Sequence, residues 1–128
     1  EIVELLKKKN YDLVVATNPL FPREAILHRI KWAGLKEEDF KLITSYEIMH
    51  ACKPQVQYYK EVLDIIGKEP EECIMVGNDV QEDMIAKSLG ITTFLLEDQI
   101  IHRKETPPDN FDYRGSYEDL KKLIIEIF

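Results

Sequence analysis

The 128-residue sequence has the length and composition of one globular domain, with 45% hydrophobic and 32% charged residues. No run of about 18 apolar residues occurs and the formal net charge is −7, so we expect neither a membrane partner nor a nucleic-acid partner. Two cysteines, Cys52 and Cys73, are too few for a disulfide framework, which favours reduced thiols in a cytoplasmic protein.

Helical and strand patterns alternate along the chain. The first half predicts, in order, a helix over 1–9, a strand over 13–16, a helix over 22–33 and a strand over 41–45. The second half predicts a helix from Pro54 to Gly67, a strand over 73–76, a helix over 81–89 closed by Gly90, a strand over 92–96 and a helix over 117–127. Residues 97–115, which include Pro107-Pro108, are predicted to be mostly loop with one edge strand near Phe111.

This alternation indicates an α/β fold, because strands that alternate with helices form crossover units and a parallel sheet. We predict a three-layer, Rossmann-like parallel sheet with helices on both faces, in a single domain over 1–128. In such sheets ligands bind beyond the carboxyl ends of the strands. The polar residues that directly follow each strand are therefore the candidates for a functional site.

Thr17 and Asn18 directly follow the first predicted strand. The hydroxyl of Thr17 and the backbone N–H groups of the turn beyond it suit an anionic oxygen. The same residue types also end many strands because they tolerate turns, so this pair alone does not establish a site.

Lys53 precedes Pro54, which we predict to occupy the first position of a helix, with Lys53 at or next to the N-cap. A cation is unfavourable at the positive end of a helix dipole unless an anion occupies the same place. The alternative is an ordinary solvated lysine, one of 13 in the chain.

Acidic and amide side chains follow the strand predicted over 73–76. Gly77 allows a tight turn, Asn78 or Asp79 then points from the strand end, and Asp83 follows one helical turn later. Two converging oxygen-bearing side chains suit a hard cation such as Mg²⁺. The alternative is a helix N-cap at Asp79 with an acidic first turn.

Taken in order, these segments resemble the second, third and fourth motifs of the haloacid dehalogenase superfamily. The segments are Val14-Val15-Ala16-Thr17-Asn18, then Lys53-Pro54, then Met75-Val76-Gly77-Asn78-Asp79 with Asp83. The separations, 36 residues from Thr17 to Lys53 and 26 from Lys53 to Asp79, resemble the branch whose cap domain is inserted upstream of the second motif. The resemblance covers essentially the whole chain and depends on the ordered set, since each motif is short.

The resemblance implies a magnesium-dependent phosphate-monoester hydrolase that acts on a small phosphorylated metabolite through an aspartyl-phosphate. Thr17 and Lys53 would be catalytic, and both would bind the substrate together with the backbone N–H of Asn18. The candidate ligands of the Mg²⁺ cofactor are Asn78, Asp79 and Asp83.

The chain departs from the superfamily in lacking the first motif, an Asp-x-Asp pattern that supplies the nucleophile and the general acid/base. In the superfamily, the strand of that motif lies between the strands that end at Thr17 and at Gly77. We therefore expect a gap in the sheet between these two strands. We also expect a longer polypeptide whose N-terminal segment carries the first motif and the cap, and no activity from these 128 residues alone.

A second departure concerns the fourth motif, which usually opens Gly-Asp but here reads Gly77-Asn78-Asp79. Either Asp79 is the ligand, four residues before Asp83, or Asn78 replaces it at a spacing of five. An amide oxygen also coordinates Mg²⁺, although less tightly than a carboxylate. The sequence leaves both alternatives open.

Three other functions fit parts of the sequence. A 2-haloacid dehalogenase-type hydrolase would need no metal, and the acids after Gly77 argue against it. A catalytically silent binding or regulatory module with this fold would account for the absent nucleophile. A phospho-receiver domain fits the length, but such domains carry paired acids after the first strand and this chain does not.

Overall fold

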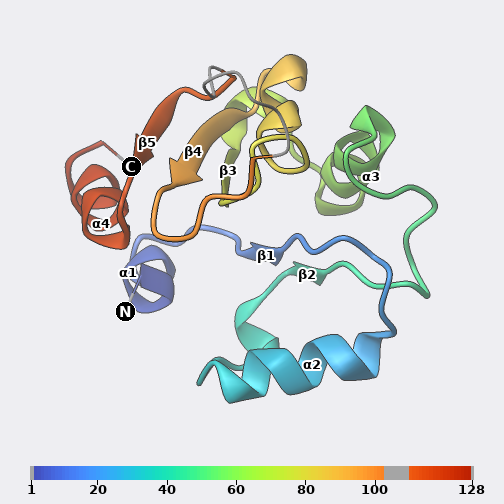
Figure 1. The fold of residues 1–128 in the computed structure, drawn as a ribbon. Helices are drawn as coiled ribbons and strands as arrows, with labels where there is room; N and C mark the ends of the chain where they lie inside the picture. Colours follow the sequence, from blue (N-terminus) through green and yellow to red (C-terminus); the bar gives the residue numbers. More distant parts are fainter. Residues whose placement is uncertain (1, 103–109, 128) are drawn as a thin grey trace.

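The computed structural model describes residues 2–102 and 110–127 (Figure 1). In chain order the helices and strands are α1 (Ile2–Lys8), β1 (Val14–Val15), α2 (Arg23–Trp32), β2 (Leu42–Ile43), α3 (Val56–Ile66), β3 (Ile74–Gly77), β4 (Thr92–Leu96), β5 (Tyr113–Gly115) and α4 (Tyr117–Glu126). Short 3-10 helices cover Glu37–Asp39, Pro70–Glu72 and Met84–Leu89. Within the described residues, no helix is long and apolar enough to cross a membrane.

The predicted helix after Lys53 is confirmed, but its predicted start at Pro54 is wrong. Gln55 is the N-cap of α3, and the helix begins at Val56. The Lys53–Pro54 peptide bond is cis, and the N–H of Gln55 donates to the carbonyl of Cys52 at 3.0 Å. Lys53 therefore lies inside a four-residue turn that precedes the helix.

The helix predicted over 81–89 is shorter than expected and is a 3-10 helix, Met84–Leu89, closed as predicted by Gly90 with a φ of 95°. The N–H groups of Gln81 and Glu82 donate to Asp79 Oδ1 at 3.1 and 2.9 Å. Because a side chain satisfies these N–H groups, residues 80–83 form a turn and the helical bonding starts later.

The predicted edge strand near Phe111 begins two residues later, at Tyr113, and pairs in parallel with β4. β5 ends at Gly115, and the next residue, Ser116, begins the capping box of α4. In this box the side chains of Ser116 and Asp119 each bond the backbone N–H of the other residue. Pro107 and Pro108 lie outside the described residues.

The strands form two parallel sheets, β1–β2 and β3–β4–β5. Across the described residues, β1 and β3 are not hydrogen-bonded to each other, as the predicted gap requires. Both β1 residues and all four β3 residues are half-buried, whereas both residues of β2 and most of β4 are buried. Apart from the outer strand β5, where Tyr113 and Arg114 are exposed, the least buried strands are therefore the two that face the interruption.

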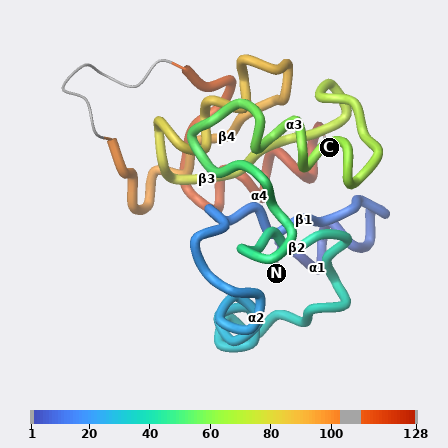
Figure 2. Tube along the Cα trace, turned by 90° about the vertical axis from the view of Figure 1, so that its right-hand side faces the viewer, coloured from blue at the N-terminus to red at the C-terminus, as the bar shows by residue number. Residues whose placement is uncertain are grey.

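Helices cover both faces of the strand layer, which confirms the predicted three-layer α/β architecture. On one face, α2 packs on Val15 and Ile43, while α1 and α4 pack on β3 and β4 through Ile74 and Val76. The opposite face carries α3, and Figures 1 and 2 show α2 and α3 on opposite sides of β1 and β2.

The core around α3 connects the two sheets. Its apolar cluster includes Val14 of β1, Leu42 of β2 and Met75 of β3, together with buried residues of α3 itself. One helix therefore packs against both sheets in a common layer, although no ladder formed by residues 2–102 and 110–127 joins them.

Asp112 ties the approach to β5 onto β4. Its Oδ2 accepts hydrogen bonds from the N–H and the hydroxyl of Thr93 at 2.9 and 3.3 Å, and Lys87 Nζ lies 3.4 Å from its Oδ1. Burial opposes ionisation of this carboxyl, but the hydrogen bonds from Thr93 and the charge of Lys87 outweigh it and hold the pKa of Asp112 below its ordinary value of 3.8.

We expect Asp112→Asn to lower the free energy of unfolding near neutral pH. In acid, the difference in this free energy between the variant and the wild type should become smaller. The folded state favours the ionised carboxyl, so its contribution is present above a pH of about 3.8 and is lost as the pH falls through the lower folded-state pKa. Urea unfolding of both proteins across this range measures the difference, with the exposed Asp64→Asn on α3 as control. A difference that stays constant with pH would contradict this role.

Candidate active site

The carboxyl ends of β1 and β3 open into one pocket of about 700 Å³. Its walls come from these two strand ends, from the turn before α3 and from the segment after β4. Four of the predicted site residues line it: Thr17, Lys53, Asn78 and Asp83. Side chains from distant parts of the sequence thus meet at one edge of the strand layer.

Lys53 and Asp83 form a buried ion pair in this pocket. Lys53 Nζ lies 2.5 Å from Asp83 Oδ1, and the two side chains are only 7% and 9% exposed. The other oxygen, Asp83 Oδ2, accepts the backbone N–H of Asp79 at 3.1 Å. Low exposure strengthens the attraction but removes much hydration from both charges. The pair therefore holds the ammonium at a fixed point of the pocket wall.

Gly77 makes room for the Asp83 carboxylate. A β-carbon at position 77 would lie 2.2 Å from Asp83 Oδ2 and 2.5 Å from its Cγ, so a side chain there would displace the carboxylate. The glycine predicted for a tight turn thus also allows the acid to lie directly against the end of β3.

Asn18 does not line the pocket and contacts Lys53 through its side chain. Asn18 Oδ1 accepts the N–H of Lys53 at 3.2 Å, and Asn18 Nδ2 donates to the carbonyl of Lys53 at 3.4 Å. The same amide nitrogen donates to Glu82 Oε1 at 3.0 Å. The family resemblance points only to the backbone of Asn18 and gives no sign of Glu82, because neither side-chain contact leaves a local signal in the sequence.

Thr17 is fixed by two buried residues that sequence reasoning also missed, Thr44 and Tyr58. Thr17 Oγ1 lies 3.3 Å from both the carbonyl and the hydroxyl oxygen of Thr44. The Thr17 carbonyl accepts from Tyr58 Oη at 2.7 Å and from Thr44 Oγ1 at 2.8 Å. Thr44 is the fourth residue of the strand predicted over 41–45, and its place near the strand end is the one available signal; Tyr58 lies among ordinary apolar helix positions.

Asn78 and Asp79 occupy different environments. Asn78 lines the pocket, and its Nδ2 donates to the carbonyl of Gln99 at 2.8 Å. Asp79 is buried, does not line the pocket and accepts two backbone N–H groups of its own turn. Asp79 therefore caps a turn, whereas the alternative interpretation predicted a helix N-cap at this residue; the N-cap of the 3-10 helix is Asp83.

The pocket offers donor atoms of the type that magnesium binds. Asn78 and Asp83 offer oxygen atoms, the ligands that Mg²⁺ prefers. In the part of the chain that the structure describes, no group of three or more His, Cys, Asp and Glu side chains gathers at one point. The described residues can thus supply part of a coordination sphere and leave the rest to substrate, water or other protein groups.

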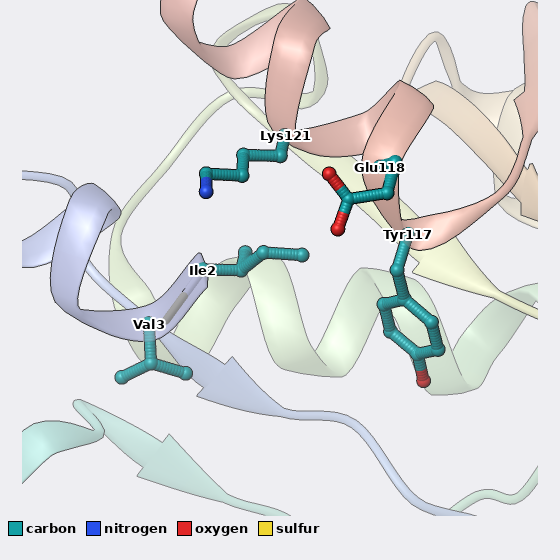
Figure 3. Close-up of a pocket in the computed structure, with 5 residues that line it drawn as sticks. All are labelled: Ile2, Val3, Tyr117, Glu118 and Lys121. Carbon is teal, nitrogen blue, oxygen red and sulfur yellow. The ribbon is translucent and has the colours of Figure 1, made fainter.

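A second, smaller hollow of about 320 Å³ lies between α1 and α4 (Figure 3). Ile2 and Val3 come from α1, and Tyr117, Glu118 and Lys121 come from α4. Tyr117 lines both pockets. The larger pocket, with its buried ion pair and hydroxyl, is the better candidate for chemistry.

Sequence comparison identifies relatives among phosphatases. The sequence model of the family described as haloacid dehalogenase-like hydrolase matches residues 1–96. The chain is 27% identical over 93 residues to pyrophosphatase PpaX of Halalkalibacterium halodurans, covering 73% of this chain and 42% of that protein. It is 28% identical over 96 residues to glyceraldehyde 3-phosphate phosphatase of Methanothermobacter thermautotrophicus, covering 74% of this chain and 41% of that protein. The chain spans about two fifths of the length of these relatives.

Solved structures share the fold. The HAD phosphatase from Thermococcus onnurineus superposes with a TM-score of 0.76 at 24% identity, covering 95% of this chain and 54% of that one. The HAD-hydrolase YfnB from Bacillus subtilis, bound to magnesium, gives 0.75 at 21% identity, covering 97% of this chain and 52% of that one. With a family match over residues 1–96 and this common fold, the chain belongs to the haloacid dehalogenase-like hydrolases.

Proposed function

We propose that this chain carries the second to fourth motifs of a magnesium-dependent phosphate-monoester hydrolase that acts on a small phosphorylated metabolite. The single observation that carries the proposal is the buried Lys53–Asp83 pair, which shares a pocket with Thr17 at the carboxyl ends of parallel strands. A fixed cation and a fixed acid beside a hydroxyl suit a phosphoryl group with a divalent cation. The phosphatase relatives support the same reaction class.

Thr17 and Lys53 would act on the phosphoryl group. The Thr17 hydroxyl would donate to a phosphoryl oxygen, and the ammonium of Lys53 would neutralise charge that builds up between nucleophile and phosphorus. Because the chain is acidic overall, with a net charge of −7, this local cation has to offset an unfavourable field for an anionic substrate. Asn18 would serve mainly by holding the main chain of Lys53.

Asp83 and Asn78 would hold the magnesium ion, with Asp79 as the cap of the turn between them. The support is that both proposed ligands line the pocket, whereas Asp79 does not. When bound, the ion would shield the negative charges of nucleophile and substrate from each other. The sulfur-free oxygen donors fit a hard cation and argue for the phosphatase over the metal-free dehalogenase.

The nucleophilic aspartate would come from a segment outside these 128 residues. Its carboxylate would attack phosphorus and release the alcohol, and water would then hydrolyse the aspartyl-phosphate to free phosphate and the original carboxylate. The support is the half-buried facing strands β1 and β3, which do not pair within the described residues and whose ends line the pocket. A parallel strand between them would join both sheets and bring its own carboxyl end to the pocket.

The natural gene product should then be larger than this chain of 15.0 kDa. Mass spectrometry of the intact protein, expressed in its own cells, measures this directly. A mature product of 15.0 kDa would remove the proposed nucleophile and favour a catalytically silent module.

We propose that the protein is located in the cytoplasm, since Cys52 and Cys73 are both free thiols.

The full-length polypeptide should release phosphate from a generic aryl phosphate when Mg²⁺ is present. This release should stop when EDTA removes the metal. Lys53→Ala should lower kcat at least about 100-fold, because the pocket loses its fixed cation. The matched control is Lys60→Ala, an exposed lysine on α3, which should keep wild-type rates. The isolated 128 residues should be inactive.

Other outcomes of this assay identify the alternatives. Turnover of a haloacid without metal would favour a dehalogenase, and no turnover of either substrate would favour the silent module. Melting temperatures are needed for each variant, because Lys53→Ala leaves the buried carboxylate of Asp83 without its cation and can also destabilise the fold.

Gly77→Ala should raise the Mg²⁺ concentration for half-maximal activity at least about tenfold, because the new methyl group displaces a proposed ligand, Asp83. The control is Gly67→Ala, the C-cap of α3 with a φ of 68° and open space around it. That change should cost about 1 kcal/mol of folding stability and leave the metal response unchanged. An unchanged metal response in Gly77→Ala would exclude Asp83 as a ligand.

A further inference from the structure

Two adjacent tyrosines on α3, Tyr58 and Tyr59, face the interior below the candidate active site. They are 0% and 3% exposed, and their rings meet edge to face at 4.9 Å between centroids. Both belong to the apolar cluster that connects the two sheets. Because the rings are packed on all sides, their hydroxyl groups have little freedom of position.

The two hydroxyl groups reach different loops of the site. Tyr58 Oη donates to the carbonyl of Thr17 at 2.7 Å and lies 3.0 Å from Thr44 Oγ1. Tyr59 Oη donates to the carbonyl of Glu82 at 2.5 Å and lies 3.5 Å from the carbonyl of Asp83. Tyr58 thus contacts the loop that carries Thr17, the proposed phosphoryl-binding residue. Tyr59 contacts the loop that carries Asp83, the proposed metal ligand.

Helix α3 therefore sets the relative position of all three motif segments. Lys53 lies three residues before its first residue, and the tyrosines hold the other two segments by their backbone carbonyls. Both carbonyls are partly buried, and each would lose one donor without its tyrosine hydroxyl, so these hydrogen bonds favour the observed position of each segment.

We propose that Tyr58 and Tyr59 are separate positioning residues of the active site, Tyr58 for the phosphoryl side through Thr17 and Tyr59 for the metal side through Asp83. The inference rests on the proposed phosphatase function and assigns roles to two residues outside the sequence motifs. Neither tyrosine touches the substrate in this scheme; each acts through the backbone carbonyl that it holds.

The protonation state of both phenols suits this role. Burial raises the pKa of Tyr58 and of Tyr59 well above the ordinary value of 10.0, and the nearby charge of Asp83 raises both further. Both hydroxyl groups therefore remain donors throughout the neutral pH range.

The test uses Tyr58→Phe and Tyr59→Phe in the full-length polypeptide, because phenylalanine keeps the ring packing and removes the hydroxyl alone. The control is Tyr113→Phe on β5, at the far edge of the second sheet. Two constants are measured for each protein: the Mg²⁺ concentration for half-maximal activity and the inhibition constant of inorganic phosphate at saturating Mg²⁺. Melting temperatures report on general destabilisation.

Each variant should change one constant and spare the other. Tyr59→Phe should raise the Mg²⁺ requirement about five- to tenfold and leave phosphate inhibition within about twofold. Tyr58→Phe should weaken phosphate inhibition by a similar factor and leave the Mg²⁺ requirement within about twofold. Equal changes in both constants, or changes that only follow the melting temperature, would overturn the assignment of separate roles.

Amide hydrogen exchange separates this inference from the proposed function, because it needs no activity. Tyr59→Phe should speed exchange at Asp83, whose N–H donates to the Asp79 carbonyl, and Tyr58→Phe should speed exchange at Thr44, whose N–H donates to the Val15 carbonyl. If the wild type is inactive but each variant speeds exchange only at its own predicted residue, the proposed phosphatase function is refuted and the positioning roles stand. An active wild type without these separate changes in exchange would refute the positioning roles alone, and failure of both measurements would refute both.

Discussion

The buried contact between Lys53 and Asp83 is the interaction on which the site depends. An ion pair with both side chains less than one tenth exposed is a weak source of stability, because each charge gives up hydration that the attraction only partly returns. Two apolar side chains would fill the same space at less cost. The presence of this ion pair in a chain with a net charge of −7 therefore favours a functional reason, and under the proposed function that reason is a cation held at one point of a pocket that receives an anionic substrate.

The geometry around the pair shows how a fold keeps such a contact in place. The main chain of Lys53 is held by the side chain of Asn18, and the carboxylate of Asp83 is held by a backbone N–H and by the close approach of Gly77. These contacts come from different strand ends, so no single loop carries the site. A shift of β1 relative to β3 would therefore separate the hydroxyl of Thr17 from the ion pair, and the packing that fixes these strands is part of the site.

The sequence predicts the fold well, and four of its candidate site residues share one pocket, because both results depend on local patterns. Short apolar runs mark the strands, and the rule that ligands bind at their carboxyl ends makes Thr17 and Asp83 candidates. Lys53 becomes a candidate through its place before the predicted helix and through the family resemblance, and all three residues line one pocket. The boundaries and supports are less predictable. The start of α3 depends on a turn around Lys53, and the roles of Asn18 and Tyr58 depend on partners 35 and 41 residues away. Helical periodicity says that Tyr58 is buried, but it carries no information on which carbonyl its hydroxyl meets.

The interrupted strand layer explains why α3 has this supporting role. In a continuous sheet the backbone ladder would fix β1 against β3, but in the described part of this chain the ladders end on either side of the interruption. The relative position of the two sheets then depends on side chains that reach both, and α3 supplies them through an apolar cluster that contains Val14 and Met75. The same helix follows Lys53 directly and places its tyrosines against the other two motif segments. One helix thus contacts both sheets and all three segments, and it would help to hold β1 and β3 on either side of a strand that entered between them.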